Sequence, residues 1–293
     1  MKLFLYNLLI AFFLLTTYGN LLAEKIDLTS WSAYTYDLSG GQAPGKWVLS
    51  DDNLAVIQIV NADPSFYLNN INQTSYKMDG SFQVKTTDDD DIIGFVFGYQ
   101  NDHQFYLFDW KQGTQNAGGY GHTYEGFRIL KIDAPNRNAL NLYDFWQSKT
   151  NNSTILASNF GDDKGWGDKK IYDFHMEFSP GTFTVIIYIG DTETELWNIT
   201  VNDNSYNSGQ FGFYNFSQAN VEYSGFEQTG GIKALVSGCI ELKNEPIQTG
   251  KAMLMQSGEI FQSVPLDNNG CYNFFHVNEE KPFGVMIRRT LEE

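Results

Sequence analysis

Basic residues are scarce in this 293-residue sequence, which has 19 lysines and arginines against 35 aspartates and glutamates and a formal net charge of −16. Nucleic acids and anionic membranes are polyanions and repel such a surface, so we expect neither as a partner. The acidity suits a secreted domain that holds divalent cations. It is equally consistent with a surface charge that only keeps an aromatic-rich β protein soluble.

Cysteine is also scarce, since only Cys239 and Cys271 are present. No second Cys or His pair accompanies them at the spacing of a structural zinc site. The four histidines are scattered, which predicts neither a metal cluster nor a His-based triad: His103, His122, His175 and His276. An oxidising compartment permits a disulfide between Cys239 and Cys271, worth roughly 3–4 kcal/mol in the chain-entropy model.

Long apolar runs are missing beyond the first residues. The opening stretch "MKLFLYNLLIAFFLLTTYGNLLAEK" has an apolar core and a plausible cleavage point after Ala23, which predicts a secretory signal peptide over residues 1–23. A retained signal anchor is the alternative, although the run is short for a membrane span. Cleavage removes one charged residue, Lys2, and changes the net charge from −16 to −17. We expect a secreted, extracellular protein with no membrane insertion after cleavage.

Helical periodicity is nearly absent, and short β-branched and aromatic runs recur between Gly, Asn and Asp. The clearest predicted strands are residues 54–60, 92–100, 104–110 and 183–190. Within residues 92–100, alternation places Phe95, Phe97 and Tyr99 on one face and Val96 and Gly98 on the other. Both faces are largely apolar, so we expect an inner strand of a two-sheet sandwich. The strand spacing over about 200 residues fits a jelly roll.

The composition changes after "FEQTGG" (residues 226–231), and we interpret Gly230 and Gly231 as a linker. The remainder, residues 232–293, carries both cysteines and its own strand pattern. Its segments "GCIELKNEPIQTGKAMLM" and "LDNNGCYNF" resemble small prealbumin-like (carboxypeptidase-regulatory-like) β modules. We therefore expect a small disulfide-linked β-sandwich module, to which we assign no chemistry.

The first domain resembles a known family in four collinear blocks. "GFVFGYQNDHQFYLFDWKQ" (residues 94–112) is similar to the core of the thrombospondin C-terminal domain. Residues 46–66, 165–174 and 209–226 match that family's W-V-x-L…N-S-D-P, G-W-x-D-K-K-x-Y and G-x-x-G-x-x-x-F-S-Q-x-N blocks. The resemblance implies an all-β, concanavalin A-like (L-type lectin-like) jelly roll over residues 24–229, in agreement with the strand pattern.

The resemblance also implies calcium binding, and it bears on the run of four aspartates that precedes residues 92–100. The family's Asp triplet falls on Asp89, Asp90 and Asp91, and the acid of the N-S-D-P block is Asp63. Ca²⁺ prefers several carboxylate and carbonyl oxygens from neighbouring loops. Side chains alternate along an extended chain, so we expect two of the triplet to face the ion together with Asp63. A solvated loop without an ion is the alternative.

Two other residues in the matching blocks have predicted roles. Asn220, in the F-S-Q-x-N block, is a weaker candidate ligand. Trp166, in "DDKGWGDKK", is interpreted as a packing anchor because that segment lacks the Asp-x-Asp-x-Asp-Gly order of an EF-hand.

Three function classes follow. The resemblance implies a calcium-binding, non-enzymatic adhesion or matrix-interaction module whose partner is an extracellular protein or glycan. A calcium-dependent carbohydrate-binding lectin is the alternative, with Tyr120, Tyr124 and Trp146 as exposed aromatics that stack on sugars. A glycoside hydrolase needs paired carboxylates, usually as E-x-D-x-x-E. The sequence offers only Asp173 and Glu177 on one strand face, so we predict no catalytic residues.

Overall fold

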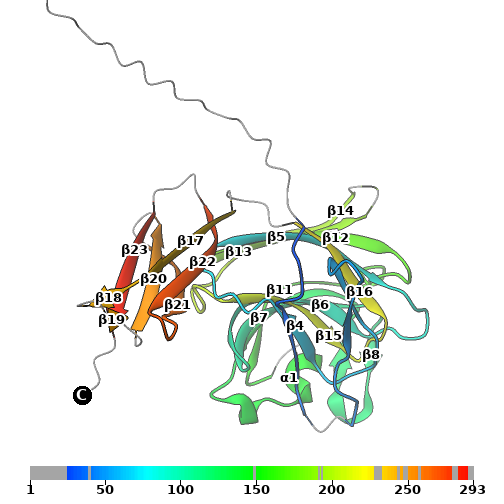
Figure 1. Ribbon diagram of the computed structural model, residues 1–293. Helices are drawn as coiled ribbons and strands as arrows, with labels where there is room; N and C mark the ends of the chain where they lie inside the picture. The colour runs from blue at the N-terminus through cyan, green and yellow to red at the C-terminus, as the bar shows by residue number, and fades with distance from the viewer. Residues whose placement is uncertain are drawn as a thin grey trace, which may run out of the picture.

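The computed structural model describes residues 25–38, 41–147, 150–190, 192, 194–227, 233–242, 245–246, 250–256, 259–278 and 283–289 (Figure 1). The predicted signal peptide lies outside the described residues. In this part of the chain, no helix is long and apolar enough to cross a membrane.

Two large antiparallel sheets form most of the molecule (Figure 1). Sheet A has the strand order β14-β13-β12-β5-β16-β3-β2. Its strands are β2 (Trp47–Leu49), β3 (Ala55–Gln58), β5 (Tyr76–Val84), β12 (Ile171–Ser179), β13 (Thr182–Ile189), β14 (Thr194–Asn202) and β16 (Val221–Glu227). Sheet B has the order β1-β4-β15-β6-β7-β10-β11. Its strands are β1 (Ser32–Thr35), β4 (Ser65–Leu68), β6 (Ile92–Asn101), β7 (Gln104–Lys111), β10 (Gly126–Asp133), β11 (Ser153–Phe160) and β15 (Gln210–Phe216).

The sheets pack face to face as a jelly-roll sandwich, which confirms the all-β prediction. Each of the four predicted strands is present: β3, β6, β7 and β13 lie at those positions, with ends shifted by up to two residues. β6 is the central strand of sheet B, as expected for an inner strand. It forms a hairpin with β7 in which Asn101 pairs with Gln104.

Sheet B is apolar on both faces because it is covered on both. One hydrophobic cluster lies between the sheets and includes Phe95 and Phe97. A second cluster lies on the other face and includes Val96 and also Tyr99. The prediction that Tyr99 shares a face with Phe95 and Phe97 is therefore wrong. Gly98 has φ +54 within a register shift of the β6–β7 pairing, and this bulge turns Tyr99 to the opposite face.

The backbone at Gly98 leaves no room for a side chain. A Cβ at this position would lie 2.9 Å from Tyr106 Cδ2 and 3.1 Å from Phe178 Cε2, in a backbone conformation that L side chains rarely adopt. We expect Gly98→Ala to lower the free energy of unfolding by about 1–3 kcal/mol, measured by urea unfolding. Gly119→Ala is the matched control, since no atom lies within 4 Å of its added Cβ. Equal stability of the two variants would contradict this explanation of the bulge.

The outer face of sheet B is covered by short connecting elements. These are β8 (Gln115–Asn116), η1 (Gly118–Tyr120), β9 (His122–Thr123), η2 (Arg137–Ala139) and α1 (Leu142–Trp146). The helix α1 begins with a capping box in which Asn141 accepts from the helix backbone and Asp144 accepts from the Asn141 N–H. In Figure 1, α1 lies on the side of sheet B that faces away from sheet A.

Arg128 ties α1 to the sheet. Its guanidinium donates two hydrogen bonds to Asp109, at 3.0 and 2.9 Å, and both side chains are buried. It also donates to the main-chain oxygens of Phe145 at 2.8 Å and Gln147 at 2.9 Å. Burial raises the pKa of Asp109, while the charge of Arg128 opposes that shift. The end of α1, with Trp146, is thus held in place through one buried ion pair.

The C-terminal part forms smaller sheets. Its strands are β17 (Lys233–Cys239), β18 (Glu241–Leu242), β19 (Glu245–Pro246), β20 (Gly250–Gln256), β21 (Glu259–Pro265), β22 (Cys271–Asn278) and β23 (Phe283–Arg289). A disulfide joins Cys239 to Cys271, which are cross-strand partners in the β17–β22 pair. Ala252, Leu254, Leu266 and Phe274 form a separate small core.

Candidate metal centre

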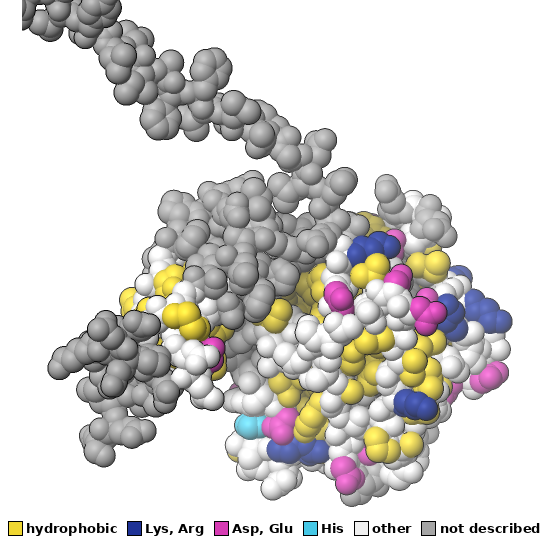
Figure 2. All heavy atoms as spheres, viewed as in Figure 1, with side chains coloured by type: hydrophobic (Ala, Val, Ile, Leu, Met, Phe, Trp, Pro, Cys, Tyr) yellow, Lys and Arg dark blue, Asp and Glu magenta, His cyan; other side chains and the backbone are white. Residues whose placement is uncertain are grey.

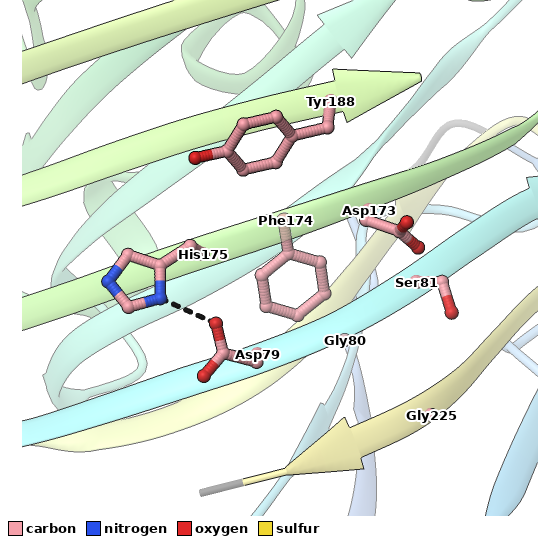
Figure 3. Close-up of a pocket in the computed structure, with 8 residues that line it drawn as sticks. All are labelled: Asp79, Gly80, Ser81, Asp173, Phe174, His175, Tyr188 and Gly225. Atoms are coloured by element: carbon pink, nitrogen blue, oxygen red, sulfur yellow. Dashed lines mark hydrogen bonds and ion pairs between the residues drawn. The ribbon is translucent and has the colours of Figure 1, made fainter. Parts of the chain in front are cut away.

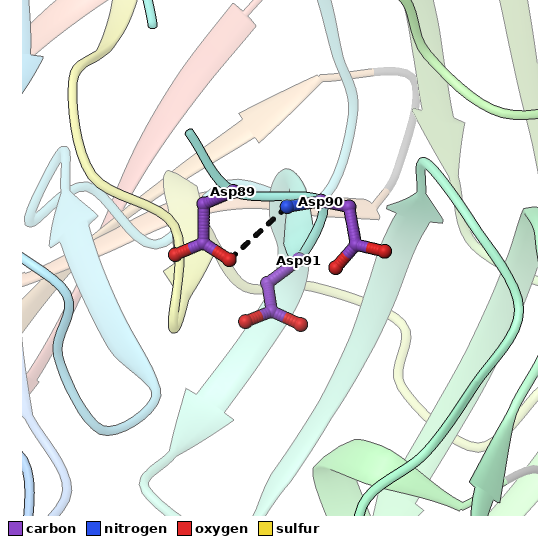
Figure 4. Close-up of side chains that lie close together, drawn as sticks. All are labelled: Asp89, Asp90 and Asp91. Carbon is purple, nitrogen blue, oxygen red and sulfur yellow. Dashed lines mark hydrogen bonds between the residues drawn. The ribbon is translucent and has the colours of Figure 1, made fainter. Parts of the chain in front are cut away.

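The three aspartates of the predicted set lie in the loop that enters β6. One carboxylate oxygen from each of Asp89, Asp90 and Asp91 lies within 4.8 Å of the others. Figure 4 shows the three side chains projecting to the same side of the loop. Residues 89–91 form no strand, and the Asp90 N–H donates to Asp89 Oδ1 at 3.1 Å, so the three side chains lie closer together than simple alternation predicts.

Distant residues hold the backbone of this loop. The Asp91 N–H donates to Gln218 Oε1 at 2.9 Å, and the Trp166 indole donates to the Asp91 carbonyl at 3.0 Å. Gln218 and Trp166 are both buried. Trp166 is therefore a packing anchor, as predicted, and it also fixes the start of β6. The side chains of the triplet are thus presented by a rigid support.

Asp63 comes from a neighbouring loop, directly before β4. Its side chain is buried, and its Oδ2 accepts from the Leu38 N–H at 3.2 Å. Asp63 and Asp91 line the same cavity of about 200 Å³. The remaining lining residues are Gln42, Gln115, Ala117, Tyr120, Leu142, Trp146, Phe216 and Ser217. The loop of Asp63 also reaches the triplet directly, since Asn61 Nδ2 donates to Asp89 Oδ2 at 2.6 Å.

Asn220, the weaker candidate, does not line this cavity. It has φ +57, and its carbonyl accepts from the Lys85 N–H at 2.8 Å. Asn220 thus has a backbone role in the loop that leads from β15 to β16, and it is not one of the residues that line the cavity.

Lys111, at the end of β7, is the functional residue that sequence reasoning missed. Its buried ammonium lies 2.5 Å from the Asp90 carbonyl oxygen, 3.0 Å from Asp90 Oδ1 and 3.1 Å from Asp91 Oδ1. It also lies 5.6 Å from the centroid of the Trp146 ring. The W-K-Q block contains this lysine, but nothing in the spacing of the sequence shows that it returns to the aspartates. Part of the acidic charge therefore has a counterion within the chain.

The remaining electrostatics favour a divalent cation. Burial raises the pKa of Asp91 to about 6, with Asp89 adding to the rise and Lys111 opposing it. Three carboxylates and one ammonium carry a formal charge of −2. Asp91 Oδ1 is buried and accepts no well-aligned hydrogen bond from the described residues, although Lys111 lies close by. Lys111 supplies one positive charge to this oxygen, and a divalent cation would balance the charge that remains.

The spacing of the triplet also fits calcium. Two oxygens on one Ca²⁺ lie at most twice the metal–oxygen distance apart, or about 4.6–5.2 Å. One oxygen from each of the three carboxylates lies no more than 4.8 Å from the others, so each pair is close enough to share an ion. The donor set is made of oxygens only, as hard cations prefer. These residues fit calcium by the chemistry of their donor atoms.

The three aromatic residues that we expected to be exposed differ from that prediction in one respect. Tyr120 and Tyr124 are exposed, at 37% and 44% of their surface, as expected. Trp146 is 5% exposed, so the prediction of an exposed ring is wrong. Its indole donates to the Gly121 carbonyl at 3.0 Å, and the Arg128 contacts to α1 keep the ring against the cavity.

A second hollow lies on the outer face of sheet A (Figure 3). It has a volume of about 510 Å³, and its lining includes Asp79, Asp173, His175 and Tyr188. His175 Nδ1 is hydrogen-bonded to Asp79, and its Nε2 lies 3.1 Å from Glu177 Oε1. Asp173 and Glu177 do share a face of β12, as predicted.

His175 makes stability depend on pH. Its hydrogen bond to Asp79 raises its pKa above 6.5, with Glu177 adding to the rise and burial opposing it. Folding favours the protonated ring, because the pKa of His175 is higher in the folded than in the unfolded protein. The protonated ring therefore stabilises the fold fully below about pH 6.5, and this stabilisation is lost as the pH rises through the pKa of the folded state. We expect His175→Gln to melt lower than wild type at pH 6 and to match it more closely at pH 9. A constant difference across this range would contradict the assignment.

The comparison with known proteins decides the family. The family model described as the thrombospondin C-terminal region matches residues 42–230, which is more than half of the chain. The chain belongs to the thrombospondin C-terminal family. This assignment confirms the resemblance found in the four sequence blocks.

Three relatives illustrate the extent of similarity to this thrombospondin-family chain. Thrombospondin-4-B of Danio rerio is 28% identical over 212 residues, which are 68% of this chain and 22% of the relative. Thrombospondin-2 of Gallus gallus is 28% identical over 69% of this chain and 18% of its own length. Thrombospondin-4 of Xenopus laevis is 29% identical over 68% and 22%. The chain thus spans about a fifth of the length of these relatives.

Solved structures with a similar fold include lectin-like sandwiches. The VIP36 exoplasmic/lumenal domain in its Ca²⁺/Man3GlcNAc-bound form has a TM-score of 0.45 and 13% identity, covering 70% of this chain and 87% of its own. The carbohydrate-binding module CBM66 from Bacillus subtilis has a TM-score of 0.45 and 13% identity, covering 69% and 96%. We base the fold class of this chain on its own two sheets.

Proposed function

We propose that this chain is a secreted, non-enzymatic adhesion or matrix-interaction module that binds calcium. Asp89, Asp90 and Asp91 would hold the ion, together with Asp63 from the neighbouring loop. The observation that carries the proposal is the convergence of three carboxylates on a rigidly supported loop in a member of the thrombospondin C-terminal family. With Asp63 included, four carboxylates and the Lys111 ammonium carry a formal charge of −3, of which bound calcium would neutralise two units. The ion would also join the loop before β4 to the loop before β6.

The proposed partner surface is the rim of the calcium-binding cavity. Tyr120 is exposed there. Its backbone is held in place because its carbonyl accepts a hydrogen bond from Gln147 Nε2 at 2.8 Å. Calcium would order the opposite wall, so binding of an extracellular protein at this rim would depend on the ion. The charged side chains on the face in Figure 2 are scattered, so no single strongly charged patch on that face competes as the contact surface.

The adhesive function is tested by attachment of cells to a surface coated with the protein. We expect attachment in millimolar calcium and its loss in a chelator. The variant Asp90→Asn should attach weakly even with calcium. Attachment that is equal with and without calcium, or absent in both, would contradict the proposal.

A calcium-dependent lectin is the second candidate. One specific observation favours it: Gln115 Oε1 is buried at the cavity and accepts no hydrogen bond from the described residues, and such an acceptor suits a sugar hydroxyl. A glycan array with and without calcium separates the two functions, because only the lectin predicts calcium-dependent retention of specific glycans.

Hydrolysis of glycosides is not proposed. A general acid needs a raised pKa, whereas hydrogen bonds from Lys77 and His175 lower the pKa of Glu177. Glu177 therefore lacks the raised pKa that a general acid in such an enzyme needs. We expect no release of reducing sugar from polysaccharides.

A further inference from the structure

Lys111 is unlike the other lysines for which the structure describes an ion pair. Its side chain is 1% exposed, whereas the paired side chains of Lys77, Lys85 and Lys131 are 48%, 43% and 21% exposed. An ammonium has three N–H donors and no acceptor. The three nearest acceptors of Lys111 all belong to the acidic loop: the Asp90 carbonyl, Asp90 Oδ1 and Asp91 Oδ1. The side chain is thus committed to the two carboxylates that would also bind calcium.

We propose that Lys111 is a built-in counter-cation of the acidic loop, which keeps the loop together without calcium and weakens its affinity for calcium. This inference rests on the calcium site proposed above. Removing Lys111 leaves Asp90 and the buried Asp91 without their opposite charge, so the loop without Lys111 should depend on a bound cation. With Lys111, a cation that arrives must share its oxygens with an ammonium already in place.

The size of the effect follows from charge and distance. A cation bound to Asp90 Oδ1 at ~2.4 Å would lie within roughly 5.5 Å of an ammonium that is 3.0 Å from the same oxygen. Even with the dielectric constant of water, repulsion between single and double charges at that separation changes a dissociation constant about tenfold. The burial of Lys111 lowers the local dielectric constant, so tenfold is the lower end of the expected range.

The test is calorimetric titration of calcium chloride into the full chain and three variants. Lys111→Met removes the charge and keeps a flexible apolar stem. Lys111→Arg retains the charge. Lys77→Met removes one positive charge from the surface of sheet A, away from the acidic loop, and controls for net charge. Melting temperatures in a chelator are measured alongside, and Lys111→Gln replaces Lys111→Met if the latter does not fold.

We expect Lys111→Met to bind calcium at least about tenfold more tightly than wild type and to melt lower in the chelator. Lys111→Arg and Lys77→Met should bind like wild type. Equal or weaker binding by folded Lys111→Met would overturn the inference while leaving the calcium site intact. Binding by Lys111→Met alone would support the inference and overturn the proposed function of the native chain. Binding by neither would overturn both.

Discussion

Replacing Arg128 with methionine should lower the free energy of unfolding by about 3–5 kcal/mol, because it leaves the buried Asp109 without its partner. The loss has two sources. Asp109 keeps a carboxylate that is 1% exposed, and the main-chain oxygens of Phe145 and Gln147 lose their donor at the end of α1. Chemical unfolding in urea measures the change. Because α1 carries Trp146, the same variant should also loosen the wall of the cavity that Asp63 and Asp91 line.

Two controls separate the buried ion pair from a general loss of charge. Lys77→Met breaks a pair with Glu177 in which the side chains are 48% and 41% exposed, so its expected cost is below about 1 kcal/mol. The double variant Arg128→Met, Asp109→Leu removes both buried charges and should recover part of the stability. An Arg128→Met variant as stable as Lys77→Met would contradict the proposed role of the buried pair.

Replacing Asp90 with asparagine should weaken calcium binding by about 10–100-fold, because one of the three converging carboxylates loses its charge. At a calcium concentration 100 times the wild-type dissociation constant, the ion adds about 2.7 kcal/mol to wild-type stability. The same concentration would add only about 0.4–1.4 kcal/mol to Asp90→Asn. Thermal melting with calcium and with a chelator measures both gains.

Asp88→Asn is the matched control for this experiment. It makes the same change of charge two residues away, at an exposed aspartate that does not belong to the converging set. Its response to calcium should remain close to that of wild type. Equal losses in Asp88→Asn and Asp90→Asn would show that the general charge of the loop matters, and not a specific site at Asp90.

The sequence predicted the framework of the fold because burial on two faces leaves a local signature. The apolar run of β6 and its hairpin with β7 are both visible in the order of residues. The failure at Tyr99 has a local cause: Gly98 is compatible with a regular strand and with a bulge, and tertiary packing decides between them. Alternation does not describe Asp89–Asp91 either, because these residues precede β6 in a loop where their carboxylates lie together.

The candidate site was predicted only as far as its aspartates. The family blocks locate Asp63 and the triplet, but Lys111, Gln218 and Trp166 reach the loop from strands and loops elsewhere in the chain. Their approach depends on closure of the sandwich, and residue spacing carries no sign of it. The buried position of Trp146 depends in the same way on the Arg128 contacts to α1.

The central claim is that calcium binds the native chain at the loop before β6. It is tested most directly by the melting temperature of the wild-type protein in 10 mM calcium chloride and in a chelator at the same ionic strength. For a dissociation constant of about 0.1 mM, the expected gain of about 2.7 kcal/mol corresponds to a rise of roughly 5–10 °C. A melting temperature that is unchanged by the chelator would contradict the claim.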